Sequence, residues 1–168
     1  DITKAKIRTY GIDAESDIRA SNLKADLQGT SFNVDVGGER ESVSVPLIGR
    51  HNVYNVLCAI GVALAEGITL KQIKTALETL PCIPGRLQQL NYGQDYHIFV
   101  DYAHSEDALE KVLQNLKSLA QKRILLVFGC GGDRDKSKRP LMAQVARRYA
   151  DLSFITNDNP REEDPKQI

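Results

Sequence analysis

A glycine-rich loop dense in charged side chains is the part of the sequence best suited to chemistry. Gly129, Gly131 and Gly132 can take backbone angles closed to other residues, so the chain can turn sharply there and expose its amides to a ligand. Charged residues follow at once: Asp133, Arg134, Asp135, Lys136, Lys138 and Arg139. Amides beside guanidinium and ammonium groups favour carboxylates and phosphates. The sequence therefore predicts an anion-binding loop at residues 129–139.

Two familiar phosphate-binding patterns do not match this loop. A dinucleotide fingerprint requires a third glycine at the position that Arg134 holds. The P-loop pattern Gly-x-x-x-x-Gly-Lys-Ser/Thr occurs nowhere in the chain. A nucleotide-phosphate loop, where the protein has one, must therefore lie outside these residues.

Two asparagines form a second candidate site. Asn55 lies three residues after Asn52 in a segment with helical periodicity, so both amides project from one side of the first turn. An amide group carries a donor and an acceptor together, which is the complement of the adenine edge. The alternative interpretation is that His51 or Asn52 only caps the helix.

Three more segments place polar side chains where predicted elements end. Arg86 follows Pro81-Cys82-Ile83-Pro84-Gly85, a stiff turning segment that predicts a domain boundary. Arg86 is either a surface charge or a hinge residue that reaches a bound phosphate. The other two segments each follow a predicted strand: Asp101-Tyr102-Ala103-His104 and Asn157-Asp158-Asn159-Pro160-Arg161.

The elements that must position these loops alternate between strand and helix after Arg86. Residues 124–128 form an unbroken apolar run, which is typical of a strand covered on both faces by helices. Further strands are predicted at residues 87–90, 97–100 and 152–156, and apolar stripes predict helices that begin after Ser105 and near Pro140. This alternation predicts a parallel sheet. Its carboxyl edge, where α/β folds bind ligands, would carry three polar loops: residues 101–104, 129–139 and 157–161.

The first part of the chain has the pattern of a scaffold. Alternating runs predict short antiparallel strands at residues 6–10, 18–27, 31–36 and 41–46, with Gly37-Gly38 as a hairpin turn. Helical spacing then predicts one helix from Val53 to a cap at Gly67, and another from Leu70 to Leu80 that Thr69 opens and Pro81 closes.

The bulk composition limits the class of protein. Lys plus Arg equal Asp plus Glu at 22 each among 168 residues, so the net charge indicates neither a nucleic acid nor a membrane as partner. Cys58, Cys82 and Cys130 are odd in number and far apart, which favours a reducing cytoplasm over a disulfide framework or a zinc site. No apolar run approaches membrane-spanning length, and no signal peptide opens the chain. Because the first residue is Asp1 rather than Met, we expect a piece of a larger protein.

The motifs together resemble those of the Mur ligases of peptidoglycan synthesis, most closely the branch that adds the third peptide residue. The matching strings occur in family order: Gly49-Arg50-His51-Asn52-Val53-Tyr54-Asn55, Gly85-Arg86, Asp101-Tyr102-Ala103-His104, Val127-Phe128-Gly129-Cys130-Gly131-Gly132-Asp133-Arg134-Asp135, Lys138-Arg139-Pro140 and Asp158-Asn159-Pro160-Arg161. The Gly-Cys-Gly-Gly-Asp-Arg-Asp and Asp-Asn-Pro-Arg strings are specific to this branch.

The resemblance implies an α/β fold in two incomplete domains. Residues 1–83 would be the tail of the central ATPase domain, built of β-strands plus helices, and residues 84–168 the beginning of a Rossmann-like C-terminal domain with a parallel sheet. It implies ATP and Mg²⁺ as cofactors, with ATP bound by Asn52, Asn55, Arg86, Asp101 and His104. His104 is alternatively a structural histidine, and Lys138 and Arg139 each face either phosphate or solvent.

The resemblance also implies the identity of the amino-acid substrate. Arg134, Asn159 and Arg161 match positions that hold the incoming amino acid, and Asp158, Asn159, Pro160 and Arg161 resemble the family's meso-diaminopimelate recognition motif. Meso-diaminopimelate differs from lysine by a second carboxylate at its far end, for which a bidentate guanidinium is the natural partner. Arg161 therefore argues for diaminopimelate and against lysine.

The implied reaction joins meso-diaminopimelate to UDP-MurNAc-L-Ala-D-Glu through an acyl phosphate, in the cytoplasm and without a nucleic acid or membrane as partner. The family's P-loop, magnesium-binding carboxylates, carbamylated lysine and final Gly-x-x-x-Glu element have no match here. No catalytic or metal-binding residue is therefore assigned, and we expect these 168 residues alone to be inactive. Ser105-Glu106 stands where the family usually has Thr-Pro, which affects only the start of a helix.

Two alternatives stay open. The first is another ATP-dependent amino-acid ligase of the same superfamily, such as a sister Mur ligase or a folylpolyglutamate synthase. Amino-acid competition in the full-length protein separates these enzymes. The second is a non-catalytic nucleotide-binding module that kept the Rossmann-like half, for which the residues encoded before Asp1 would contain no P-loop.

Overall fold

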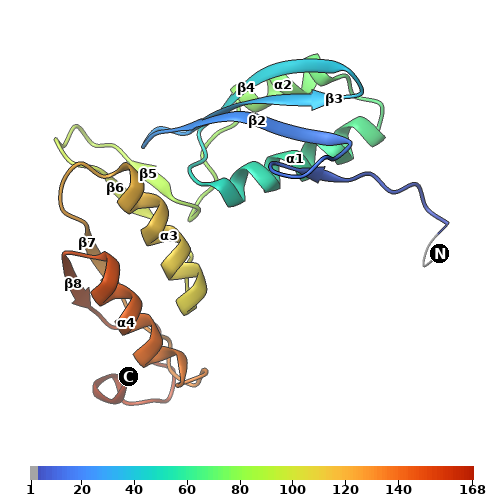
Figure 1. Ribbon diagram of the computed structural model, residues 1–168. Helices are drawn as coiled ribbons and strands as arrows, with labels where there is room; N and C mark the ends of the chain where they lie inside the picture. Colours follow the sequence, from blue (N-terminus) through green and yellow to red (C-terminus); the bar gives the residue numbers. More distant parts are fainter. Residues whose placement is uncertain (1–3) are drawn as a thin grey trace. The chain divides into compact units, whose positions relative to one another are not determined.

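The computed structural model describes residues 4–168, and the chain divides into two compact units, residues 1–100 and 101–168 (Figure 1). Each unit has a hydrophobic core of its own. Within the described residues, no helix is both apolar enough and long enough to cross a bilayer.

A four-stranded sheet forms one layer of the first unit. Its strands lie in chain order: β1 (Tyr10–Gly11), β2 (Ile18–Ala25), β3 (Thr30–Val36) and β4 (Glu39–Val45). β1 pairs in parallel with β2, and the other neighbours are antiparallel. The predicted turn at Gly37-Gly38 is confirmed, with φ values of 58° and 92° that a two-residue hairpin turn favours. The predicted strand at residues 6–10 is wrong except at Tyr10, because pairing in β1 is confined to two residues.

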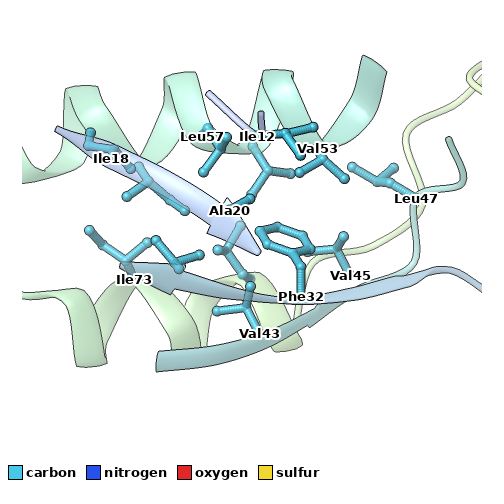
Figure 2. Close-up of a cluster of buried hydrophobic side chains, with 14 of the residues drawn as sticks. Ile12, Ile18, Ala20, Phe32, Val43, Val45, Leu47, Val53, Leu57 and Ile73 are labelled. Carbon is cyan, nitrogen blue, oxygen red and sulfur yellow. The ribbon is translucent and has the colours of Figure 1, made fainter. Parts of the chain in front are cut away.

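Two helices, α1 (Arg50–Ala65) and α2 (Leu70–Glu78), cover one face of this sheet. Side chains alternate between the faces of a strand, so Ile18 and Ala20 of β2, Phe32 of β3, and Val43 and Val45 of β4 point toward the helices (Figure 2). The fully buried members of this core are Ile18, Ala20, Phe32, Val34, Val43, Val53, Leu57 and Ile60. The predicted start of α2 is confirmed, because Thr69 and Gln72 form a reciprocal capping box, whereas the helix ends at Glu78, two residues before the predicted end at Leu80.

A short hairpin ends the first unit. β5 (Gln88–Leu90) and β6 (Ile98–Val100) pair with each other in antiparallel fashion. The two predicted strands are therefore present, but they do not follow the parallel pattern expected after Arg86. The connection between them is too short for the crossover that parallel neighbours require.

The second unit contains the predicted parallel pair. β7 (Leu125–Phe128) and β8 (Leu152–Ile155) run in parallel, and α4 (Lys138–Tyr149) is the crossover between them. α3 (Glu106–Leu119) precedes β7 and packs beside α4, and a short 3-10 helix at Pro165–Gln167 follows β8 (Figure 1). Ser105 caps α3 as predicted, because its side chain accepts the amide of Ala108.

Among the described residues, the helices cover only one face of the β7–β8 pair. Leu126 and Phe128 pack with Leu113 of α3 and Met142 of α4, whereas Val127 on the opposite face is 65% exposed. The prediction that helices cover this strand on both faces is therefore wrong for these residues, because α3 and α4 contribute to one and the same cluster.

Candidate functional site

The loop after β7 and the segment after β8 lie in direct contact, and two glycines make that contact possible. A Cβ on Gly129 would lie 2.3 Å from the carbonyl oxygen of Thr156, and one on Gly132 would lie 1.9 Å from that of Pro160. None of the loop's glycines has a positive φ, so the prediction that they supply unusual backbone angles is wrong. Because these glycines have no side chain, the backbone of the loop after β7 can approach the backbone of the segment after β8 closely.

The amides of the glycine-rich loop also serve this contact. The amide of Gly132 donates to the carbonyl of Asn159 at 2.9 Å, and the amide of Asp133 donates to the carboxylate of Glu163 at 3.1 Å. In return, the carboxylate of Asp133 accepts the amide of Glu162 at 3.0 Å. We call this set of contacts between residues 129–139 and 156–163 the loop pair.

Arg161 lies at the centre of the loop pair. It occupies the left-handed region with φ 51°, in a turn that the bond from the Glu163 amide to the Pro160 carbonyl closes at 3.0 Å. Its Nη1 donates to the carbonyl of Gly132 at 2.5 Å, and its amide donates to Oδ1 of Asn159 at 3.2 Å. The guanidinium is thereby held against the glycine-rich loop by one of its donors, which leaves other N–H groups of the same plane for a ligand.

Arg134 belongs to the same loop pair. It follows Asp133, whose φ of 52° is also left-handed, and its side chain is exposed. Within residues 4–168, the Arg134 guanidinium forms no hydrogen bond or ion pair. The structure thus brings together the two loops that carry the predicted arginines, of which Arg161 is hydrogen-bonded to the facing loop and Arg134 is not.

The remaining residues of the predicted recognition motif shape the turn. Oδ1 of Asp158 accepts the amide of Asn159 at 2.7 Å, and the Asp158 carboxylate lies beside Gly131. Pro160 contributes its carbonyl to the turn at Glu163. Asp158 and Asn159 are both exposed, so their side chains stay accessible from solvent.

The loop at residues 101–104 reaches the same part of the second unit. Nζ of Lys138, at the start of α4, donates to the carbonyl of His104 at 2.6 Å. Asp101 accepts the amide of Ala103 at 2.8 Å, and the exposed His104 ring packs edge-on against Tyr102 with centroids 5.1 Å apart. This bond joins the 101–104 loop to the start of α4, but that loop follows β6, which pairs with β5, so the predicted single sheet edge carries only the two loops after β7 and β8.

A cluster around Glu163 was not found from the sequence. Its carboxylate receives both terminal nitrogens of Arg139, at 2.9 and 2.7 Å, and Nζ of Lys136 at 2.8 Å. The pKa of Glu163 lies well below its usual range because of the hydrogen bonds from Arg139 and, next, from Lys136. Both terminal nitrogens of Arg139 are therefore engaged by Glu163, and the Arg139 side chain is 12% exposed. The two partners are 24 residues apart, and no spacing rule connects positions on different elements.

The first unit carries the remaining predicted residues. Asn52 is 4% exposed, and its Nδ2 donates back to the carbonyl of Ile48 at 2.9 Å. It does not cap α1, because Gly49, with φ 99°, precedes the helix and no side chain caps it. Nδ2 of the exposed Asn55 donates to Oδ1 of Asn52 at 3.2 Å, so the two amides lie on one side of the helix as predicted. Arg86 is exposed and follows a tight turn in which Gly85 has φ 69°.

No group of three or more His, Cys, Asp or Glu side chains among residues 4–168 has the arrangement of a metal site.

Comparison with known proteins gives the family. The model of the Mur ligase middle domain matches residues 2–63, and that of the Mur ligase glutamate ligase domain matches residues 85–168. A curated relative from Syntrophomonas wolfei, named UDP-N-acetylmuramoyl-L-alanyl-D-glutamate–2,6-diaminopimelate ligase, is 48% identical over 161 residues, which cover 96% of this chain and 33% of that protein.

Solved structures agree on the fold. A structure titled with the same ligase name has a TM-score of 0.67 and 40% identity, covering 97% of this chain and 34% of that one. Folylpolyglutamate synthetase from Lactobacillus casei has a TM-score of 0.70 at 21% identity, covering 88% of this chain and 37% of that one, a likeness that shows the fold alone. The chain spans about a third of the length of the relatives it matches. With one family model covering half of its residues and a second covering most of the other half, the chain belongs to the Mur ligase family.

Proposed function

We propose that this chain is part of an ATP-dependent ligase that joins meso-diaminopimelate to the D-glutamyl carboxylate of UDP-MurNAc-L-Ala-D-Glu through an acyl phosphate, in the cytoplasm. The names of the similar ligases support this assignment. The observation that carries it is the loop pair, in which the Arg161 guanidinium is held on the loop that carries Arg134.

The amino-acid site consists of Arg134, Asp158, Asn159, Pro160 and Arg161. A planar guanidinium that already has one fixed contact is oriented before the ligand arrives, so it loses less side-chain entropy when it binds a carboxylate in bidentate fashion. Asp158 places a negative charge near the same turn, which suits an ammonium group of the substrate. An amino acid with carboxylate and ammonium groups at both ends fits this arrangement better than lysine does.

The nucleotide site consists of Asn52, Asn55, Arg86, Asp101 and His104. Asn55 is the exposed member of the asparagine pair, and the buried Asn52 holds its amide in place, so we assign the direct adenine contact to Asn55 and its orientation to Asn52. ATP, when bound with Mg²⁺, supplies the phosphoryl group that activates the carboxylate.

The domain boundary is proposed at residues 83 and 84, within the turning segment before Arg86. The family match that begins at residue 85 supports this division. The compact units divide later, after Val100, because the β5–β6 hairpin groups with the first unit.

The test is substitution of Arg161 by Ala in the full-length protein. We expect the KM for meso-diaminopimelate to rise by about a hundredfold, in line with the loss of a charged, bidentate contact, while the KM for ATP stays unchanged. Arg147→Ala is the matched control, because Arg147 is exposed on α4. An unchanged KM for diaminopimelate would remove Arg161 from the site.

Amino-acid competition tests the substrate class. If the full-length protein ligates glutamate to a folate or lysine to the nucleotide precursor, and diaminopimelate does not compete, the proposed function is wrong and a sister enzyme is indicated. Absence of a P-loop upstream of Asp1 would instead indicate the non-catalytic module.

A further inference from the structure

Glu163 is the most enclosed acidic side chain of the loop pair. Its side chain is only 9% exposed, and that of its partner Arg139 is 12% exposed. A carboxylate is seldom buried to this degree unless cations or amides satisfy it. Here three groups do so: the Arg139 guanidinium, the Lys136 ammonium and the Asp133 amide.

These three partners all lie on the β7–α4 side of the loop pair, whereas Glu163 lies on the other side, two residues after Arg161. Asp133 precedes Arg134 directly, and Arg139 is in the first turn of α4. One carboxylate therefore fixes the turn that carries Arg161 to three points around the loop that carries Arg134. A further hydrogen bond runs the other way: the amide of Glu162, beside Arg161, donates to the carboxylate of Asp133.

The arrangement constrains two backbone conformations that are otherwise unfavourable, one at Arg161 and one at the neighbour of Arg134. Arg161 and Asp133, the neighbour of Arg134, both have left-handed φ values, which cost energy for residues other than glycine. Such conformations persist only where surrounding contacts determine them, and Glu163 accepts the amide of one of these two residues while its own amide closes the turn that contains the other.

We propose that Glu163 is a positioning residue that sets the separation and orientation of Arg134 and Arg161, and thereby selects an amino acid with a carboxylate at each end. This inference rests on the proposed function. Glu163 does not touch the substrate in this proposal, since its oxygens are already occupied by Arg139, Lys136 and Asp133. It acts through the geometry of the two arginines.

The experiment measures steady-state kinetics of the full-length protein carrying Glu163→Gln. The amide keeps the size of the side chain but cannot accept a bidentate guanidinium. We expect the KM for meso-diaminopimelate to rise by about tenfold or more, while kcat at saturation and the KM for ATP each change by less than about twofold. Discrimination against lysine should fall by a similar factor, because a loosened pair of arginines no longer rejects the substrate with one carboxylate.

Two matched variants separate positioning from general damage. Glu162→Gln removes the same charge from the exposed neighbouring side chain and should leave all constants unchanged. Arg139→Lys keeps the positive charge but loses the planar fork, so it should reproduce the KM effect of Glu163→Gln, and the double variant should add little to either single one.

The outcomes are distinguishable. If the unmodified protein does not ligate diaminopimelate, the proposed function itself fails. If it does, and both Glu163→Gln and Arg139→Lys leave the KM for diaminopimelate unchanged, the positioning inference is overturned and the proposed function stands. A fall in kcat together with equal changes in the KM for diaminopimelate and the KM for ATP would likewise overturn it, since that result shows a purely structural role. Should Glu163→Gln not fold, Arg139→Lys and Glu163→Asp provide the same comparison.

Discussion

At the scale of single residues, the glycines of the motif differ in what they make possible. Gly132 sits where a Cβ would meet the backbone oxygen of Pro160, which cannot move without opening the loop pair. At Gly131 the nearest atom is Nη1 of Arg161, 3.0 Å from an added Cβ, and this is the far end of a flexible side chain. Two neighbouring glycines therefore have different physical reasons to be glycine.

Alanine substitutions should separate these reasons. Gly132→Ala is expected to lower the free energy of unfolding by about 2 kcal/mol or more, since a methyl group would overlap the backbone. Gly131→Ala should change stability by less than about 0.5 kcal/mol and instead raise the KM for the amino acid, because it displaces the Arg161 guanidinium. Denaturant unfolding and steady-state kinetics check the pair, and equal stability losses in both variants would contradict the interpretation.

The asparagine pair offers a second contrast between neighbours. Asn52→Ala removes a donor to the Ile48 carbonyl from the interior, so we expect a loss of stability of about 1–3 kcal/mol. Asn55→Ala removes an exposed amide and should raise the KM for ATP with little effect on stability. Thermal unfolding and ATP titration of both variants test this division, and an unchanged KM for ATP in Asn55→Ala would remove it from the adenine site.

At the scale of elements, the ion pairs of the loop pair predict a specific pH dependence. The folded-state pKa of Glu163 is lowered by hydrogen bonds, from Arg139 first. Its contribution to stability is therefore fully present above the usual carboxyl pKa of 4.5 and is lost as pH falls toward the depressed folded value. The difference in melting temperature between the unmodified protein and Glu163→Gln should be largest near pH 7 and shrink as pH falls to about 3. A difference that is constant over this range would exclude an ionised Glu163 as its cause.

The capping box of α2 makes a simpler prediction. Thr69 accepts the Gln72 amide at 3.3 Å, and the Thr69 amide donates to the Gln72 side chain at 3.0 Å. We expect Thr69→Ala to cost about 1 kcal/mol and Thr69→Ser to cost only a few tenths, because serine keeps the hydroxyl. Denaturant unfolding monitored by circular dichroism measures both, and equal losses would show that the cap bond is not the cause.

Elements with local signals were predicted well from the sequence. The turn at Gly37-Gly38, the cap at Thr69 and the parallel pair of β7 and β8 depend on neighbouring residues and short-range periodicity. The hairpin of β5 and β6 and the exposed face of β7 depend on which elements lie nearby, and a single apolar run does not contain that information.

The same division applies to the candidate site. The loops after β7 and β8 were predicted correctly because the ends of these strands are visible in the sequence, whereas the ion pair between Glu163 and Arg139 joins positions on different elements. The glycines were recognised as special, but for the wrong reason, because the clash that excludes a side chain arises from a segment about 30 residues away.

At the scale of the whole molecule, the two units have separate cores and one of them has an open apolar face. Leu125, Val127, Leu152 and Phe154 are each about half exposed or more, and their pairing across adjacent strands places them on one face. Contiguous apolar side chains of this kind bind hydrophobic probes or associate with one another.

We expect the 168-residue chain to bind the dye ANS while it retains its secondary structure. The double substitution Val127→Lys and Phe154→Lys should reduce the dye fluorescence to about half or less, because these two residues are paired on that face and would place charges there. Gln144→Lys serves as the control, because it adds a lysine on the exposed side of α4, away from this face. Equal fluorescence in all three proteins would locate the dye elsewhere.

The bond from Arg161 to the Gly132 carbonyl has a consequence for engineering a different preference. Replacing this arginine by a short neutral residue would not only delete a charge, since it would also leave a backbone oxygen of the facing loop without its donor. A variant meant to accept a monocarboxylic amino acid would therefore need a compensating donor at a second position. Exchange of this one side chain alone should yield a poorer enzyme rather than a redirected one.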